Sequence, residues 1–424
     1  MASPISPSGS TKRQSRNISH PLPRRSTRGP LDAVDDPLAS PLRSPSPAST
    51  IDAPVVGLEP QTPEPILQVS QSVDVDLRFL KDPSSYHQLS TEDIPVGFLE
   101  SEHQPPQDTP LEELLKNGHF RRAAGTALIA FARCHAEDAV RIFQLLYVRL
   151  ACLVLISRAD LAAVEAASLT DFLARSAPGA ETVTPLIPWE LRILLVRLQS
   201  IAAADGGRRG IIALYALSAE VRAHITDAKA AEDDEDVAIW AARLRDLGFR
   251  IADTLVEMGE LETATRHLDT LRDPNGDELA YRKALLRLRI GDVSGAQQSM
   301  SKMDAGVRKD SLIALLAAAN GDTSKAVEHW RSLCEQHPED SSLASNLAVG
   351  LLYICKFTEA RTVFEELATR SPAFQGLLFN IGTIYELCSE RTQQLKSNLA
   401  QNMSNKTPAT ASGGWERANF EFKL

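Results

Sequence analysis

Aromatic residues are scarce in this chain of 424 residues, at 5%, although 43% of the residues are hydrophobic. Alanine and leucine therefore supply most of the surface that can be buried. Because β-sandwiches depend on aromatic and β-branched residues, this composition favours packed helices over sheets. The length allows two or three domains of about 100–200 residues each.

Cysteine is also sparse, and no two cysteines form a Cys-x-x-Cys pair. The five residues are scattered and odd in number: Cys134, Cys152, Cys334, Cys355 and Cys388. This pattern argues against a disulfide framework or a zinc site and favours a reducing compartment. The most apolar run, residues 147–156, is interrupted by Arg149 and is shorter than the ~20 residues of a spanning helix. Because the first residues carry no apolar signal core, we expect a soluble intracellular protein.

Basic residues are fewer than acidic ones: the chain has 45 Lys and Arg against 55 Asp and Glu, so its formal net charge is −10. A general nucleic-acid binder needs clustered cations, so no nucleic-acid partner is expected. Motifs of catalysis are missing as well: there is no phosphate loop, no His-Glu-x-x-His and no Gly-x-Ser-x-Gly. The glycine-rich residues 206–210 lack the lysine of a phosphate loop and are interpreted as a turn between helices. We expect no enzyme, no cofactor and no metal.

Proline divides the chain at about residue 110, because 18 of the 25 prolines lie within the first 110 residues. They alternate with Ser, Thr and Asp, a composition that lacks the apolar surface to offset the entropy of ordering. Residues 1–109 are therefore predicted to form a disordered head, in which two short apolar pieces, 73–80 and 94–99, can order on a partner. Ser-Pro or Thr-Pro pairs, which are substrates of proline-directed kinases, begin at Ser3, Ser6, Ser40, Ser44, Ser46, Thr62 and Thr109.

From Pro110 onward, apolar residues recur at helical spacing. Thr109 and Pro110, followed by Glu112 and Glu113, predict a helix start with a capping hydroxyl and acids near the positive helix end. Helical patterns follow at about 137–158, 160–175, 188–204 and 209–229. We expect a block of diverged helical hairpins over 110–230, an acidic solvated loop at 232–236, a repeat array with a final capping helix over 237–402, and a tail over 403–424.

Four segments of the second half align with one another. They begin at Gly259, Gly291, Gly321 and Cys355 and read GELETATRHLDTL, GDVSGAQQSMSKM, GDTSKAVEHWRSL and CKFTEARTVFEEL. Each has an alanine five residues after its first position and a large residue four further on: Ala264, Ala296, Ala326 and Ala360, then Leu268, Met300, Trp330 and Phe364. The alanines are 32, 30 and 34 residues apart. This spacing places each pair on one face of a helix.

The first helix of the last two units repeats too, since Leu347, Ala348 and Leu351 recur 34 residues later as Ile381, Gly382 and Tyr385. A period of 34 is that of the tetratricopeptide repeat. Small residues such as Ala348 and Gly382 let two helices approach, and glycine before the second helix ends the first in a left-handed conformation. One unit cannot bury its own apolar stripe, so several must stack. We predict an all-α fold: a right-handed α-solenoid of tetratricopeptide-type hairpins after a disordered N-terminal region.

Asn346 and Asn380 lie 34 residues apart, at a position of the first helix that usually faces the concave groove of such arrays, and Tyr353 is expected on the same surface. Two interpretations stay open. The amides either bond to the backbone or to one another, or they capture a peptide in the groove. Chaperone co-factors with a carboxylate clamp use asparagine here together with Lys and Arg, which the neighbouring groove positions lack.

Three strings resemble a specific family: IPWELRILLVRLQ (187–199), SNLAVGLLYICKFTEA (345–360) and LLFNIGTIYELCSERTQQLK (377–396). Together they are similar to subunit 12 of the TRAPP (transport protein particle) complex, over residues 110–424. The resemblance implies a non-catalytic scaffold in a vesicle tether acting between endoplasmic reticulum and Golgi, with links to autophagy. It also implies other tether subunits as partners, an indirect link to a Rab GTPase, and a cytoplasmic protein that is peripheral on endoplasmic reticulum–Golgi intermediate or Golgi membranes. The alternatives are a chaperone co-factor and a cargo or motor adaptor that binds peptide termini.

Overall fold

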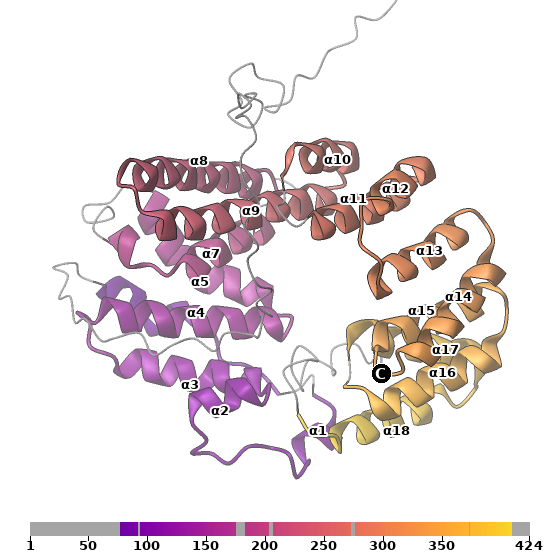
Figure 1. Ribbon diagram of the computed structural model, residues 1–424. Helices are drawn as coiled ribbons and strands as arrows, with labels where there is room; N and C mark the ends of the chain where they lie inside the picture. Colours follow the sequence, from indigo (N-terminus) through magenta and orange to yellow (C-terminus); the bar gives the residue numbers. More distant parts are fainter. Residues whose placement is uncertain are drawn as a thin grey trace, which may run out of the picture. The chain divides into compact units, whose positions relative to one another are not determined.

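The computed structural model describes residues 77–91, 94–174, 183–202, 207–272, 276–372 and 374–408. Every regular element in these ranges is a helix and none is a strand, so the prediction of an all-α fold is confirmed (Figure 1). Most of the predicted disordered head (1–76), and residues 409–424 of the predicted tail, lie outside the described residues. The Ser-Pro and Thr-Pro pairs from Ser3 to Thr62 lie there as well.

The first half of the described chain contains short 3₁₀ turns followed by antiparallel helices. Their bounds are η1 Arg78–Lys81, η2 Pro83–Ser85, α1 Val96–Leu99, α2 Leu111–Lys116, α3 Phe120–Arg133, α4 Ala139–Leu155, α5 Ala159–Ala174, η3 Thr184–Leu186, α7 Trp189–Ala202 and α8 Arg208–Ala230. The four helical patterns expected between 137 and 229 correspond to α4, α5, α7 and α8. The start of α2 differs in one detail: the Thr109 hydroxyl donates to the Pro106 carbonyl oxygen at 2.9 Å and does not cap the helix.

The second half of the described chain contains ten helices, which pair in chain order as five hairpins. Their bounds are α9 Asp234–Glu257, α10 Leu261–Thr270, α11 Asp277–Ile290, α12 Val293–Met300, α13 Val307–Ala319, α14 Thr323–Gln336, α15 Ser341–Tyr353, α16 Phe357–Arg370, α17 Gln375–Cys388 and α18 Thr392–Ser404. Each helix packs on its neighbours along the chain, and α11 also contacts α13 while α15 contacts α17. That pattern, in which first helices of successive hairpins meet, is the stacking of tetratricopeptide units.

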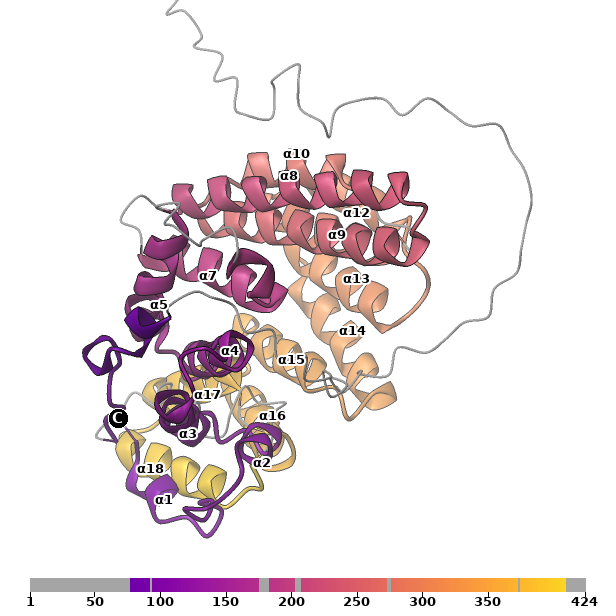
Figure 2. The ribbon, with the colours of Figure 1, turned by 90° about the vertical axis from the view of Figure 1, so that its left-hand side faces the viewer.

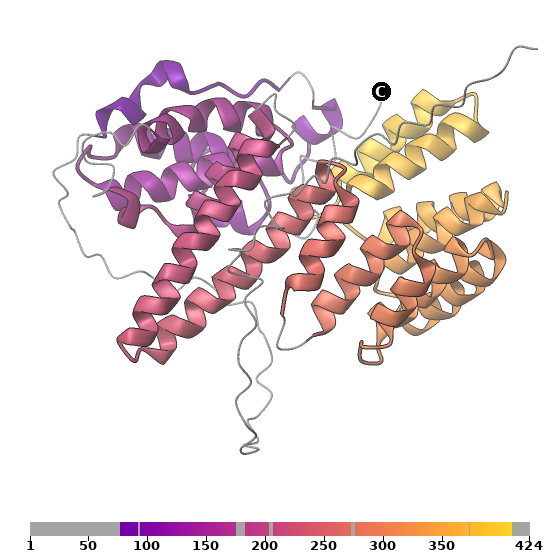
Figure 3. The same ribbon diagram turned by 90° about the horizontal axis from the view of Figure 1, so that it is seen from above.

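The acidic run at 232–236 is mostly helix rather than loop. Glu232 turns the chain with φ of 59°, and the Asp233 carboxylate caps α9 by accepting the Asp236 amide at 3.0 Å. The remaining acids form the first turn of α9, where the helix dipole favours negative charge. Because α8 and α9 then pack on each other, the run joins two helices that are neighbours in sequence and in space (Figure 3).

The repeat glycines adopt the backbone that ends a helix. Gly259, Gly291 and Gly321 have φ of 81°, 84° and 87°, and Cys355 takes the equivalent place with φ of 62°. A side chain at positive φ is strained, so the cysteine has an energetic cost that glycine avoids. The following helices are capped by aspartates in two units: Asp292 accepts from the Gly295 amide at 2.9 Å, as Asp322 does from the Lys325 amide.

The aligned alanines and their large partners lie in the core. Ala264, Ala296, Ala326, Ala348 and Ala360 are fully buried, and Leu268, Met300, Trp330, Phe364 and Tyr385 are at most 5% exposed. A close crossing in the last repeats, however, is at a residue outside the aligned pattern. A Cβ atom on Gly350 would lie 2.9 Å from Val327 Cγ2 and 3.0 Å from Trp330 Cζ3, whereas one on Gly382 would meet only Lys396 Cε at 3.7 Å. Gly350 therefore needs to be glycine, and Gly382 does not.

The described residues before Pro110, from Leu77 onward, are already packed on the helices. Residues 77–91 pack on the first helical block, where Leu77 and Leu80 are buried. Residues 94–105 pack on the last helix, where Ile94 and Phe98 are buried beside Leu399 and Met403 of α18. We call these two segments the strap. Residues 77–80 of the first apolar piece and the described residues of the second, which were expected to order on a partner, thus order on the chain itself, because each finds a complementary surface on helices distant in sequence.

The contact between α1 and α18 includes polar bonds. The Ser101 hydroxyl donates to the Ser404 carbonyl oxygen at 2.7 Å, and His103 Nε2 lies 3.1 Å from the Asn405 carbonyl oxygen. Gly97 allows the approach, since a Cβ there would lie 2.7 Å from Gln401 Oε1. Figures 1 and 2 both show α1 beside α18. The strap thereby joins the first helices of the chain to its last hairpin.

Candidate protein-interaction surfaces

Ion pairs connect the first helices of successive hairpins. Arg197 of α7 forms a two-point contact with Glu257 of α9, with 2.7 Å from Nη2 to Oε1. Further along, Arg282 Nη1 of α11 lies 3.0 Å from Asp253 Oδ1 of α9, and Arg308 Nη1 of α13 lies 2.7 Å from Glu278 Oε2 of α11. We call this series the ion-pair ladder. It links neighbouring repeats to one another.

The electrostatics of the ladder are clearest at Glu278. Its carboxylate accepts hydrogen bonds from Arg282, one turn later on α11, and from Arg308 of the next repeat. The hydrogen bond from Arg282 is the main reason why the pKa of Glu278 lies below its ordinary value of 4.5. The carboxylate is therefore held in its charged form by two neighbours at once.

A pocket of about 190 Å³ opens where α7, α8 and α9 meet, and the Arg197–Glu257 pair forms part of its wall. Its volume is below the roughly 300–1,000 Å³ of typical small-molecule sites. Gly210 and Ser200 line the pocket. The two helices approach closely there, since a Cβ atom on Gly210 would lie 2.5 Å from Ser200 Cβ. The pocket is a gap at a close helix crossing that is too small for an organic cofactor.

The candidate groove residues lie on α15 and α17. Asn346 and Asn380 are half-buried, and in the described part of the chain neither side-chain amide has a hydrogen-bond partner. The interpretation in which these amides bond to backbone or to each other therefore has no contact to support it. Tyr353, at the end of α15, has 78% of its surface exposed.

Apolar side chains accompany these amides. Phe379 and Leu387 of α17 are 46% and 68% exposed. Leu387 is the 34-residue equivalent of Tyr353, so the two occupy matching positions on helices that contact each other. We call Asn346, Tyr353, Phe379, Asn380 and Leu387 the α15–α17 face. Free amides beside exposed apolar groups suit a peptide, whose backbone needs hydrogen bonds and whose side chains need apolar surface.

The cysteines divide by burial. Burial raises the pKa of the Cys152 thiol to about 12, and it raises the pKa of Cys134 and Cys334 as well, so these sulfurs stay protonated at neutral pH. Cys355 and Cys388 are exposed. Within the described ranges, no group of His, Cys, Asp or Glu could hold a metal ion, and no helix is long and apolar enough to cross a membrane.

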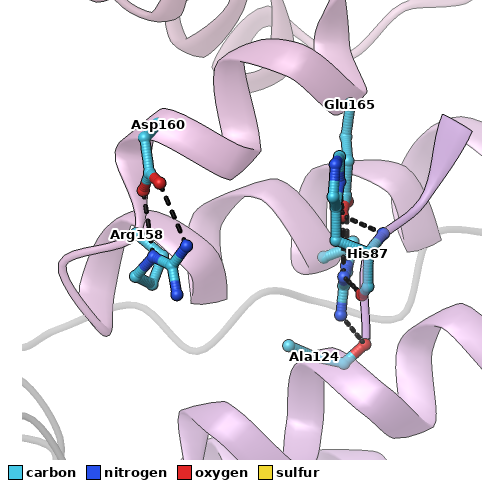
Figure 4. A network of polar contacts seen from close by, with 6 residues as sticks. His87, Ala124, Arg158, Asp160 and Glu165 are labelled. Carbon is cyan, nitrogen blue, oxygen red and sulfur yellow. Dashed lines mark hydrogen bonds and ion pairs between the residues drawn. The ribbon is translucent and has the colours of Figure 1, made fainter. Parts of the chain in front are cut away.

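A buried polar network holds the strap against the first helical block (Figure 4). Glu165 of α5 accepts two bonds from Arg149 of α4 and a third, at 3.0 Å, from the backbone amide of His87. Arg149 also donates to the carbonyl oxygens of His87 and Ala124, at 2.7 and 3.2 Å. The network thus binds both the backbone amide and the backbone carbonyl oxygen of His87. Sequence reasoning treated Arg149 only as an interruption of an apolar run, although a cation in such a run is itself a sign of a buried partner.

Comparison with known proteins supports the resemblance noted in the sequence. No family model matches the chain. The chain is 24% identical to mouse trafficking protein particle complex subunit 12 over 186 residues, which cover 40% of this chain and 23% of that protein. It is 23% identical to the human protein over 189 residues, 40% of this chain and 25% of that protein. The aligned part thus spans about a quarter of the length of these curated relatives.

Solved structures with partial likeness are tetratricopeptide proteins. One is a tetratricopeptide repeat protein from Parabacteroides merdae, 19% identical with a TM-score of 0.38, which covers 66% of this chain and 96% of that one. Another is the tetratricopeptide domain of P58(IPK), which is 14% identical with a TM-score of 0.20. The match covers 73% of this chain and 87% of that one. The chain is thus similar in sequence to subunit 12 of the trafficking particle complex over 40% of its length, and its described helices pack as successive hairpins.

Proposed function

We propose that this chain is a non-catalytic scaffold subunit of a TRAPP-like tethering complex, acting in transport between endoplasmic reticulum and Golgi. The observation that carries the proposal is the similarity of 40% of the chain to trafficking particle subunit 12. In this role the chain contributes architecture, while nucleotide exchange on a Rab GTPase belongs to other subunits. Its membrane association is peripheral and comes through the complex, and a link to autophagy follows the same assembly.

The ion-pair ladder and the strap suit a scaffold. A scaffold must hold its binding surfaces at fixed positions, and ion pairs across three repeat boundaries resist sliding of one hairpin over the next. The α15–α17 face is the part of the repeat array that we assign to a partner. Its two amides are separated by one repeat, so they can bond the backbone of one extended segment.

Affinity purification of the full chain from its native cells tests the proposal. We expect other tether subunits in near-stoichiometric amounts. A Tyr353→Ala, Phe379→Ala double variant should reduce the recovery of at least one subunit, because truncated aromatic anchors commonly cost most of an interface's energy. Ile313→Ala, at another exposed position of the array (39%), is the matched control and should leave recovery unchanged. Isolation of the wild-type chain as a lone monomer would contradict the proposal.

A further inference from the structure

Five arginines stack on aromatic rings within the described residues. The pairs are Arg192 over Trp189, Arg243 over both Trp189 and Trp240, Arg282 over Phe249, Arg308 over Tyr281, and Arg361 over Tyr385. Four of these arginines also pair with a carboxylate: Arg192 with Glu220, Arg282 with Asp253 and Glu278, Arg308 with Glu278, and Arg361 with Glu365. Stacking plus an ion pair is thus the usual arrangement in this protein.

Arg243 departs from that arrangement. Its guanidinium carbon lies 5.2 Å from the centroid of Trp189 and 4.4 Å from that of Trp240. Across the ranges that the structure describes, the guanidinium has neither an ion pair nor a hydrogen bond. Rings attract a guanidinium through its charge but do not use its in-plane N–H groups, so five donors on a half-buried cation remain available.

The aromatic frame around Arg243 is built by three helices. Trp189 of α7 meets Trp240 of α9 edge to face, with centroids 6.0 Å apart and planes at 86°. His224 of α8 stacks on Trp240 at 4.3 Å. Arg192, which stacks on Trp189, is fixed by Glu220 through bonds of 2.7 and 2.5 Å. We call Trp189, His224, Trp240 and Arg243 the tryptophan–arginine cluster.

Acidic groups nearby are already engaged. Glu220 bonds to Arg192, and Asp246, three residues after Arg243 on α9, pairs with Arg250 at 2.6 Å. The charge of Arg243 is therefore not neutralised by either carboxylate. One turn before Arg243 on the same helical face, Ile239 is 42% exposed. Tryptophan, arginine and an exposed aliphatic group are the residue types that dominate binding energy in protein interfaces.

From this geometry we propose that the tryptophan–arginine cluster is a docking site for an acidic segment of a partner protein. Arg243 binds the carboxylate or phosphate of one side chain, and Ile239 with the tryptophan edges covers an adjacent apolar residue. A guanidinium held between two rings loses little rotamer freedom on binding, so it recognises a planar anion through paired hydrogen bonds at low entropic cost. This inference goes beyond the proposed function and holds for any assembly, because it concerns a site away from the α15–α17 face.

Fluorescence anisotropy with the full chain and labelled decapeptides tests the site. The probes are an alternating Leu-Glu peptide, its Leu-Gln counterpart, and a Leu-phosphoserine peptide. We expect at least tenfold tighter binding of an acidic peptide than of the Leu-Gln peptide, with affinity falling as salt rises. Arg243→Gln should remove that preference, and Arg243→Lys should keep only part of it, because lysine lacks the planar fork. Whichever acidic peptide binds more tightly identifies carboxylate or phosphate as the source of the anion.

Arg308→Gln is the matched control, since Arg308 also stacks on an aromatic ring but already has Glu278 as its partner. It should leave the anisotropy titration unchanged. Hydrogen exchange of α9 in Arg243→Lys checks that the fold is intact, so a loss of binding is not a loss of structure. Three results would each overturn the proposal. The first is equal binding of the acidic and amide peptides, and the second is an equal loss of peptide affinity in Arg243→Gln and Arg308→Gln. The third is binding of anionic phospholipid vesicles without binding of the peptides.

Discussion

The guanidinium of Arg149 and the carboxylate of Glu165 form a two-point contact between α4 and α5, with Nε 2.9 Å from Oε2 and Nη2 2.8 Å from Oε1. The side chains are 2% and 0% exposed. Such burial is costly for both charges, and the cost is offset only because every remaining polar atom finds a partner. Here the strap supplies two of those partners through the backbone of His87, and the Ala124 carbonyl oxygen of α3 supplies another. The pair and the strap therefore depend on each other.

Removing the anion of this pair should destabilise the first helical block strongly. In Glu165→Ala, Arg149 keeps a buried charge without its counter-ion, for which we expect a loss of about 3–5 kcal/mol. Hydrogen exchange of α4 and α5 is the appropriate measurement, because it reports the local stability of this block. The double variant Arg149→Met, Glu165→Leu should recover most of the loss, because no unpaired charge remains. Equal damage in the single and double variants would contradict this account.

The strap can be tested separately through the backbone of His87. His87→Pro removes the amide that donates to Glu165, whereas His87→Ala keeps it. We expect faster hydrogen exchange over 77–91 in the proline variant and nearly unchanged exchange in the alanine variant. If the two variants behave alike, the backbone contact does not hold the strap.

The other end of the strap depends on Phe98, which is fully buried against α18. Phe98→Ala should cost about 3–5 kcal/mol of local stability, since it leaves a cavity beside Leu399 and Met403. The exchange of α18 amides should rise accordingly. Val96→Ala is the control on the same short helix, because Val96 is 62% exposed and its truncation removes little contact. A chain lacking residues 1–109 should show both strap effects together, and one lacking residues 1–76 should show neither.

Substitution of alanine for glycine should change the stability of the protein in opposite directions in two neighbouring repeats. Gly350→Ala places a methyl group against Val327 and Trp330, both buried, and should destabilise by about 1–3 kcal/mol. Gly382→Ala meets only the flexible end of Lys396 and should stabilise by about 0.5–1 kcal/mol through helix propensity. Thermal melting followed by circular dichroism distinguishes the two. A loss of stability in Gly382→Ala would contradict the open crossing at α17.

The repeat array was predictable because its signal is local. Ala326 and Trp330 are four residues apart on one helix, so their shared face follows from helical geometry alone. Gly350 escaped notice because its need for a small side chain comes from Trp330 on the preceding hairpin, a pairing that periodicity does not encode. The same holds for Arg149 and Glu165, which lie 16 residues apart on separate helices. Contacts between helices depend on how the helices cross, and the spacing of residues along the sequence does not determine that geometry.

The strap was missed for a related reason. Ile94 and Phe98 stand among prolines and acids, a composition that predicts disorder when it is judged by its own apolar content. Their burial comes from α18, about 300 residues further along the chain. A short apolar motif within a polar segment can be ordered by a distant surface, and the composition of the segment does not reveal that surface.

Acid should weaken the ion-pair ladder, and Glu278 is the residue through which to measure it. Because its pKa is lower in the folded chain than its ordinary value of 4.5, the unfolded chain binds more protons in acid. The contribution of Glu278 is therefore complete above about pH 4.5 and is lost as the pH falls through its folded pKa. Glu278→Gln should melt at a lower temperature than wild type at pH 7 and at nearly the same temperature at pH 3. Glu335→Gln, at an exposed carboxylate outside the ladder, should follow wild type throughout. A constant difference between Glu278→Gln and wild type from pH 7 to pH 3 would show that the charge of Glu278 does not stabilise the repeats.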